Sequence, residues 1–228
     1  MRLDLARYAY PDISTIQLAG RRFYSLTPEL AYPSITTILG HTQPPETATW
    51  IDKWKARVGN DKAEQVRNAA ANRGSNTHLM LERYVRGEDI GASQFPAEHV
   101  KIFNSLKASL THVNVVVGQE VALFSSAFEV AGRCDMVAEY DGELAIVDYK
   151  TSTRVKSEAD IGDYWLQCAF YALAHNEMYG TNIEKMVILM GVENKLPLTF
   201  KKRISDTLII GLANRVAKFY DGLEAELA

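Results

Sequence analysis

The sequence predicts an α/β protein in which a central mixed sheet is flanked by helices, and three observations lead to this prediction. Residues 113–150 contain three successive runs rich in β-branched residues and joined by short connections, which is typical of neighbouring strands. On both sides of these runs the apolar residues are spaced as in helices, over 62–86, 95–112 and 158–179. The apolar run 185–192 then returns as a buried strand.

The chain before this sheet predicts a hairpin followed by helices. Residues 13–26 alternate around Ala19-Gly20, which indicates a small hairpin. Ser34 precedes the apolar stretch 35–39 and fits the N-cap of a short helix. A helix over 47–58 carries Trp50 and Trp54 one turn apart. We expect an N-terminal hairpin and helical region over 1–60 and the core over 61–228, together forming one compact domain.

Glycines mark the ends of the two longest helices expected before and after the sheet. The helix over 62–86 ends near Gly87, and the helix over 158–179 ends at Gly180. A strand over 199–204 and an amphipathic helix over 206–226 complete the chain.

Most of the predicted chemistry lies in residues 132–150, GRCDMVAEYDGELAIVDYK. Asp141-Gly142 fits a two-residue type I′ hairpin turn, in which both central residues need φ > 0. If Tyr140 faces Glu143 across this turn, the register of every facing pair along the hairpin follows.

This register brings Asp135 opposite Asp148, where like charges destabilise an antiparallel pair. A divalent cation would offset the repulsion, because hard cations such as Mg²⁺ take carboxylate oxygens as ligands. Lys150 lies on the same strand face as Asp148. Two carboxylates, a metal and an ammonium suit phosphodiester hydrolysis, with the lysine orienting the attacking water or neutralising developing charge. The register also places Arg133 opposite Lys150, which requires a strand bend or a bound phosphate.

The alternative is that Asp135, Asp148 and Lys150 are ordinary surface residues on a solvated face of the sheet. Apolar residues on both faces of the hairpin argue against it, because an unpaired carboxylate pair in a covered hairpin is costly; these residues are Met136, Val137, Ile146 and Val147.

Four motifs in this order resemble those of the PD-(D/E)XK nuclease superfamily, in its RecB-like branch. They are Gly74-x-x-x-His78, Gly132-x-x-Asp135, Asp148-Tyr149-Lys150 and Gln167-x-x-x-Tyr171. The segment Pro33-Ser34-Ile35-Thr36 resembles the N-terminal segment of small phage and mitochondrial-maintenance-type exonucleases of this branch. The resemblance implies an αβββαβ restriction-endonuclease-like core, with the preceding helical region as a lid or channel wall.

The resemblance also implies roles for individual residues. The catalytic set is Asp135, Asp148 and Lys150. A Mg²⁺ or Mn²⁺ ion would be held by Asp135 and Asp148, helped by the backbone carbonyl of Tyr149, by His78 and by Glu120. The expected DNA contacts are Gln167, Tyr171, Arg133, Ser34 and Trp50.

Several of these residues also have a purely structural interpretation. Glu120 fits a solvated strand position, Ser34 fits an N-cap alone, and Tyr171 fits a core position. The tryptophan stripe fits either a core helix or a surface that stacks unpaired bases.

Composition limits the class of protein. The 228 residues are 47% hydrophobic and 23% charged, as in ordinary globular proteins, and the net charge of −3 argues against non-specific coating of nucleic acid. No apolar run is long enough to cross a membrane, and no signal peptide is visible, so we expect a cytoplasmic protein, in the host cytoplasm if it comes from a phage. Cys134 and Cys168 are expected to be buried free thiols, and two cysteines cannot hold a four-cysteine iron-sulfur cluster.

We predict a Mg²⁺- or Mn²⁺-dependent deoxyribonuclease, and specifically an exonuclease that acts from DNA ends and prefers single strands. The preference for ends follows from the resemblance alone. Two alternatives remain: an endonuclease of the same superfamily, junction-resolving or of restriction type, and a non-catalytic module that binds DNA or a recombination partner. DNA is the expected partner, together with a recombination or replication protein, and no membrane is involved.

Overall fold

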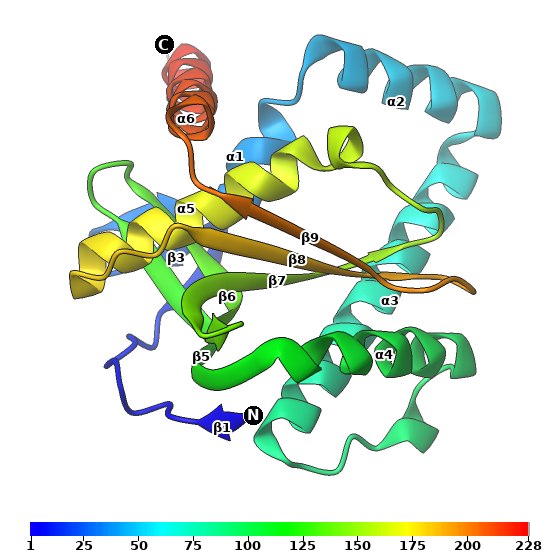
Figure 1. Ribbon diagram of the computed structural model, residues 1–228. Coiled ribbons are helices and arrows are strands. Elements are labelled where there is room, and N and C mark those ends of the chain that lie inside the picture. Colours follow the sequence, from blue (N-terminus) through cyan, green and yellow to red (C-terminus); the bar gives the residue numbers. More distant parts are fainter. Residues whose placement is uncertain (228) are drawn as a thin grey trace.

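A computed structural model describes residues 1–227 and confirms the mixed α/β architecture (Figure 1). The main sheet has six strands in the order β1-β5-β6-β7-β8-β9. Strand β7 pairs parallel with β8 and antiparallel with β6, so the sheet is mixed. The strands are β1 (Arg2–Leu3), β5 (Val113–Ser125), β6 (Val130–Tyr140), β7 (Glu143–Ser152), β8 (Lys185–Val192) and β9 (Leu198–Arg203).

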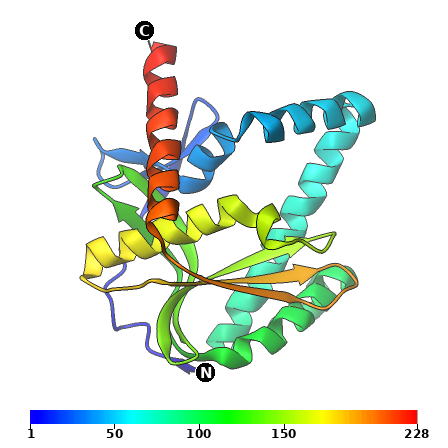
Figure 2. The ribbon, with the colours of Figure 1, turned by 45° about the horizontal axis from the view of Figure 1, so that its top comes forward.

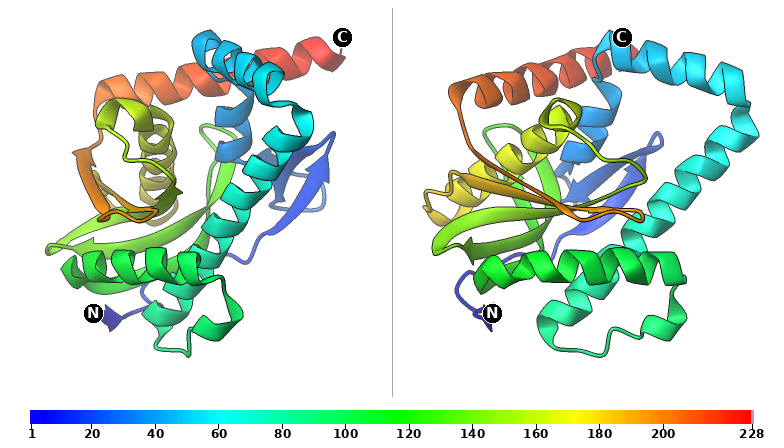
Figure 3. Two further views of the ribbon diagram at one scale, coloured as in Figure 1. Left: turned by 90° about the vertical axis from the view of Figure 1, so that its right-hand side faces the viewer. Right: turned by 45° about the vertical axis from the view of Figure 1, so that its right-hand side comes forward.

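Helices cover both faces of the sheet. Successive side chains of a strand point to opposite faces, so each face carries apolar side chains that a helix layer buries. Val137 and Ile146 pack in a core with α1 (Ile35–His41) and α5 (Gly162–Tyr179), and α6 (Asp206–Leu227) packs on those two helices. Met136 and Val147 face a second core with α3 (Asn60–Arg86) and α4 (Ala97–Ser109) (Figure 3). Three short 3₁₀ helices complete the elements: η1 (Ala92–Gln94), η2 (Leu110–His112) and η3 (Glu158–Ile161).

The predicted N-terminal hairpin is confirmed, and it belongs to a second, three-stranded sheet. Its strands are β2 (Ser14–Leu18), β3 (Arg21–Ser25) and β4 (Ala31–Pro33). The turn residues Ala19 and Gly20 have φ of 49° and 73°, as a type I′ turn needs. A single bridge between Ser34 and Ala131 joins this small sheet to β6. The sequence did not predict β4, which brings the small sheet against the main one.

Helix α2 (Pro45–Val58) and the first half of α3 stand away from the sheets (Figure 2). Gly59, with φ of 85°, separates the two helices. None of the α2 residues is buried, and the Trp50 side chain is 64% exposed. The interpretation of the tryptophan stripe as a core stripe is therefore wrong.

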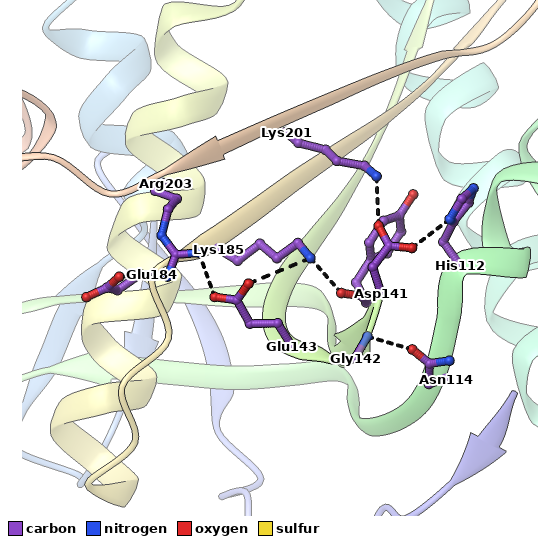
Figure 4. A network of polar contacts seen from close by, with 10 residues as sticks. His112, Asn114, Asp141, Gly142, Glu143, Glu184, Lys185, Lys201 and Arg203 are labelled. Carbon is purple, nitrogen blue, oxygen red and sulfur yellow. Dashed lines mark hydrogen bonds and ion pairs between the residues drawn. The ribbon is translucent and has the colours of Figure 1, made fainter.

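The predicted Asp141-Gly142 turn closes the β6–β7 hairpin, with φ of 52° and 77° (Figure 4). Lys201 Nζ donates to the Asp141 carboxylate at 2.8 Å, and His112 Nδ1 contacts its other oxygen at 2.7 Å. The Gly142 N–H donates to Asn114 Oδ1 at 2.9 Å. These contacts anchor the turn to β9 through Lys201, to η2 through His112 and to β5 through Asn114.

The predicted hairpin register is confirmed from Tyr140/Glu143 as far as Met136/Val147, where the backbone pairing of β6 with β7 ends. Beyond that point β6 continues on β5, and β7 continues on β8. The predicted facing of Arg133 and Lys150 is therefore wrong, and Asp135 and Asp148 do not form a pair in the backbone ladder either.

A side chain explains why the strands part. The Tyr149 N–H donates to Asp135 Oδ2 at 2.7 Å, so a carboxylate occupies the position of a backbone partner. Both cysteines are buried free thiols, as predicted. No helix within residues 1–227 is both long and apolar enough to span a membrane.

Candidate active site

The parting of β6 and β7 opens onto a cleft of about 830 Å³ between α3, the main sheet and the N-terminal sheet. Most of the predicted site residues line this cleft: Ser34, Gly74, His78, Glu120, Arg133, Asp135, Lys150, Gln167 and Tyr171. Asp148 and Tyr149 lie just behind its wall, next in sequence to Lys150, and Trp50 lies on α2 outside it. The fold thus brings together four motifs that are far apart in the sequence.

Three predicted metal ligands form one cluster. One ligand atom each from His78, Glu120 and Asp135 lie within 4.8 Å of one another. His78 comes from α3, Glu120 from β5 and Asp135 from β6. Two carboxylate oxygens and one imidazole nitrogen are ligands that Mg²⁺ or Mn²⁺ accepts, so the residues present fit such an ion.

His78 bridges the two strands at the point where they part. Its Nδ1 lies 3.4 Å from Asp135 Oδ1, and its Nε2 donates to the Tyr149 carbonyl oxygen at 3.0 Å. Burial lowers the pKa of His78, but the Asp135 carboxylate outweighs burial and raises that pKa to about 9. The imidazolium in turn lowers the pKa of Asp135 against the opposing effect of burial. His78 must lose its proton before it can coordinate a metal.

Asp148 is buried beside this cluster and stays outside it. Its side chain is 1% exposed, and it forms an ion pair with Lys150 Nζ. Burial, reinforced by the Asp135 charge, raises the pKa of Asp148 to about 6. The Asp135 charge opposes ionisation of the buried Asp148, and a cation at the cluster would offset that repulsion.

Lys150 lies between a carboxylate and an aromatic ring. Its Nζ contacts Asp148 and lies 5.0 Å from the centre of the Tyr164 ring. Burial lowers the pKa of Lys150, but the Asp148 charge outweighs burial and raises it. The sequence analysis did not identify Tyr164. Its position three and seven residues before Gln167 and Tyr171 on α5 is the signal that places it on their face of the helix.

Glu120 lies in an unusual backbone conformation. Its neighbours Gln119 and Val121 pair with Met136 and Cys134, so Glu120 faces Asp135 across the two strands. Its φ is 52°, in the left-handed region that a non-glycine residue adopts only at a cost. Burial and the Asp135 charge raise the pKa of Glu120 to about 7.

The strained strand at Glu120 is held by a neighbouring arginine. Arg133 Nη1 donates to the backbone carbonyl oxygen of Glu120 at 2.6 Å. The Arg133 side chain lines the cleft and contributes positive charge there.

The predicted Gln167–Tyr171 pair is in contact, since Gln167 Nε2 donates to the Tyr171 hydroxyl at 3.0 Å. Tyr171 is buried and packs in the core under α5, while its hydroxyl edge lines the cleft. A Cβ atom at Gly132 would lie 2.8 Å from the Tyr171 ring. Glycine is therefore required at Gly132 for Tyr171 to approach β6, a contact that the sequence did not reveal.

The N-terminal sheet contributes a wall of the cleft that the sequence analysis missed. Arg22 lines the cleft, and its Nη2 donates to Thr36 Oγ1 at 2.7 Å. Ser34 is fully buried, and its Oγ accepts from the Thr37 N–H at 3.0 Å, as an N-cap does. The expected DNA contacts all stay predictions: Gln167, Tyr171, Arg133, Ser34 and Trp50.

Comparison with known proteins gives a consistent result. The family model of the PD-(D/E)XK nuclease superfamily matches residues 95–197. Mitochondrial genome maintenance exonuclease 1 of Xenopus tropicalis is 30% identical over 172 residues, 72% of this chain and 50% of the relative. The protein of the same name from Mus musculus is 28% identical over 174 residues, 72% of this chain and 51% of the relative. The chain thus spans about half the length of the curated relatives it matches.

Among solved structures, an alkaline exonuclease from Laribacter hongkongensis is similar with a TM-score of 0.39 and 12% identity, over 67% of this chain and 79% of that one. The family model and the curated relatives together confirm the predicted resemblance.

Proposed function

Because the chain resembles the PD-(D/E)XK nuclease superfamily, we propose that it is a deoxyribonuclease that depends on a divalent cation, Mg²⁺ or Mn²⁺, and degrades DNA from an end. One observation carries the proposal: the cluster of His78, Glu120 and Asp135 lies beside the buried Asp148–Lys150 pair in an open cleft. The curated relatives are named exonucleases, which supports action from ends.

In this proposal, the carboxylates of Asp135 and Glu120 and the deprotonated His78 hold the cation, and Asp148 adds negative charge behind them. A divalent cation bound there supplies polarisation of a phosphate and a more acidic water. Asp135 is already oriented for this role, because the Tyr149 N–H fixes one of its oxygens and leaves the other directed at His78.

Lys150 acts on the attacking water or on the charge that develops on the phosphate. Its ammonium is held by Asp148 and the Tyr164 ring at the cleft wall, so it is positioned before substrate arrives. A fixed positive charge aimed at developing negative charge lowers the barrier more than it strengthens ground-state binding.

Two arginines of the cleft, Arg22 and Arg133, supply positive charge for the phosphates that flank the cleaved bond. Gln167 and Tyr171 steady the strand from the α5 side. The preference for single strands belongs to the same proposal. A cytoplasmic location and a recombination or replication partner stay predictions.

The test is digestion of end-labelled linear DNA and of closed circles of the same sequence, each single- and double-stranded. Reactions contain Mg²⁺, Mn²⁺ or EDTA, and Asp135→Asn serves as the inactive control. We expect metal-dependent loss of label from linear single strands, with circles surviving. Equal cutting of circles would identify an endonuclease, and absence of metal-dependent cleavage of any DNA would overturn the proposal.

A further inference from the structure

Helix α2 is exposed to solvent although its sequence contains large aromatic residues. It buries none of its residues, yet it carries two tryptophans. Large aromatic side chains are usually buried in a core or used for binding. The helix stands away from the sheets (Figure 2), and the Trp50 side chain is 64% exposed.

The two indole rings form a parallel pair. Trp50 and Trp54 have ring centres 6.4 Å apart and ring planes that differ by 4°. Ring centres roughly 4.5–7 Å apart are usual for offset-stacked aromatic pairs, so the two indoles stack on each other. The pair therefore presents an aromatic surface on a helix whose Trp50 side chain is largely exposed.

Positive charge lies on the same face of the helix. Lys53 and Arg57 follow Trp50 by three and seven residues, so they share its face. With the two tryptophans they line a hollow of about 290 Å³. No ion pair within the described residues involves Lys53 or Arg57. Both cations are thus available for phosphate groups.

We propose that the hollow lined by Trp50 and Trp54, called the slot below, is where one unpaired nucleobase stacks on an indole face, with Lys53 and Arg57 on the phosphates next to it. The occupant is a single-stranded nucleic acid, because a base inside a duplex already stacks on its neighbours. This inference rests on the proposed nuclease function and adds a second contact with the strand, outside the cleft.

The slot lies far enough from the candidate metal cluster to act on a different nucleotide. Ala63 lines a second hollow beside Trp54, and His78 lies about 15 residues further along α3, or roughly 22 Å at the rise of an α-helix. That distance corresponds to roughly six or seven stacked nucleotides. The slot should therefore matter for long strands only.

Binding is measured without cleavage, in EDTA, by the tryptophan fluorescence of the whole chain. The chain has three tryptophans, and Trp165 is buried, so quenching by a 20-nucleotide oligo(dT) reports on Trp50 and Trp54. We expect quenching by the single strand and none by a blunt duplex of the same length. Trp50→Ala should weaken oligo(dT) binding roughly 5- to 150-fold, and Trp50→Phe, which keeps a flat ring, should recover most of it.

Val66→Ala is the matched control, because Val66 is another exposed apolar residue of the projecting helices and lines neither hollow. Circular dichroism of Trp50→Ala checks that α2 stays folded. If α2 unfolds in that variant, the comparison of wild type with Trp50→Phe tests the slot in its place. Oligo(dT) affinity that is the same in wild type, Trp50→Ala and Trp50→Phe, or binding without quenching, would overturn the slot.

Cleavage separates this inference from the proposed function. Trp50→Ala should cleave oligonucleotides shorter than about six residues at the wild-type rate and lose activity on long strands, since only long strands reach the slot. Equal loss at every length would overturn the slot while the nuclease proposal stands. Strand binding with quenching but without cleavage would overturn the nuclease proposal while the slot stands. Failure of the wild type to bind any strand would overturn both.

Discussion

The backbone N–H of Tyr149 donates to the carboxylate of Asp135 at 2.7 Å, and this single contact marks where the central hairpin opens. Backbone pairing of β6 with β7 ends at Met136/Val147, one residue from Asp135 and two residues before Tyr149. Beyond this point the two strands diverge and the space between them is lined by charged side chains. The Asp135 carboxylate thus has two roles: it binds the backbone where the β6–β7 pairing ends, and it belongs to the candidate metal cluster.

Replacement of Lys150 by alanine should lower kcat by about 10²–10³-fold and leave KM nearly unchanged, because the ammonium acts mainly on developing charge. Steady-state kinetics on a linear single strand measure both constants. Lys156→Ala is the matched control, since Lys156 Nζ lies over the same Tyr164 ring at 4.7 Å and contacts neither carboxylate. A loss confined to KM would contradict the role assigned to Lys150.

Metal binding should stabilise the fold through Glu120. At a Mn²⁺ concentration of about 100 times Kd, binding adds about 2.7 kcal/mol to the free energy of unfolding. Glu120→Gln should shift the Mn²⁺ dependence of Tm to higher concentration. Glu82→Gln should behave as wild type, because Glu82 lines the cleft but pairs with Arg86 and lies outside the cluster. Identical metal titrations of the wild type and Glu120→Gln would remove Glu120 from the metal site.

Gly132→Ala should destabilise the fold by about 1–3 kcal/mol, because the new Cβ would overlap the Tyr171 ring and approach Ile35 at 3.1 Å. Urea unfolding measures the change. Gly162→Ala is the control: a Cβ there meets no atom within 4 Å, so stability should stay the same or rise by up to about 1 kcal/mol. Wild-type stability of Gly132→Ala would show that Tyr171 does not require the glycine.

His175 should make the fold sensitive to mild acid. Its side chain is fully buried, its Nε2 contacts the Tyr10 hydroxyl at 2.9 Å and its Nδ1 contacts Thr181 Oγ1 at 2.8 Å. Burial lowers the pKa of His175 to about 4. The unfolded chain, with a histidine pKa of about 6.5, then binds more protons than the folded one between these two values.

The contribution of neutral His175 is therefore complete above about pH 6.5 and is lost as the pH falls toward 4, by up to about 3 kcal/mol. Urea unfolding at several pH values measures it, and His175→Gln should remove this part of the pH dependence. Glu120 and Asp148, whose pKa values are raised, act in the opposite sense in both proteins, so the comparison decides. The same change of unfolding free energy between pH 6.5 and 4.5 in wild type and His175→Gln would contradict the assignment.

The sequence by itself determined the local features of this protein. Two adjacent residues, Asp141 and Gly142, defined the hairpin turn and hence the register of the pairs near it, because a two-residue turn permits only one facing pair beside it. Glycines 87 and 180 marked the ends of α3 and α5, where the backbone enters the left-handed region. Motif order and spacing along the chain also indicated the resemblance that the family model confirms.

Only the tertiary structure decided where that register ends and what surrounds the site. The left-handed Glu120 and the contact of Gly132 with Tyr171 depend on segments that are distant in the sequence. The same holds for Arg22, which reaches the cleft from the N-terminal sheet, and for Tyr164 beside Lys150. The physical reason is that spacing along a chain determines which residues share a face of one element, whereas contacts between elements depend on how those faces pack, and packing is a property of the whole chain.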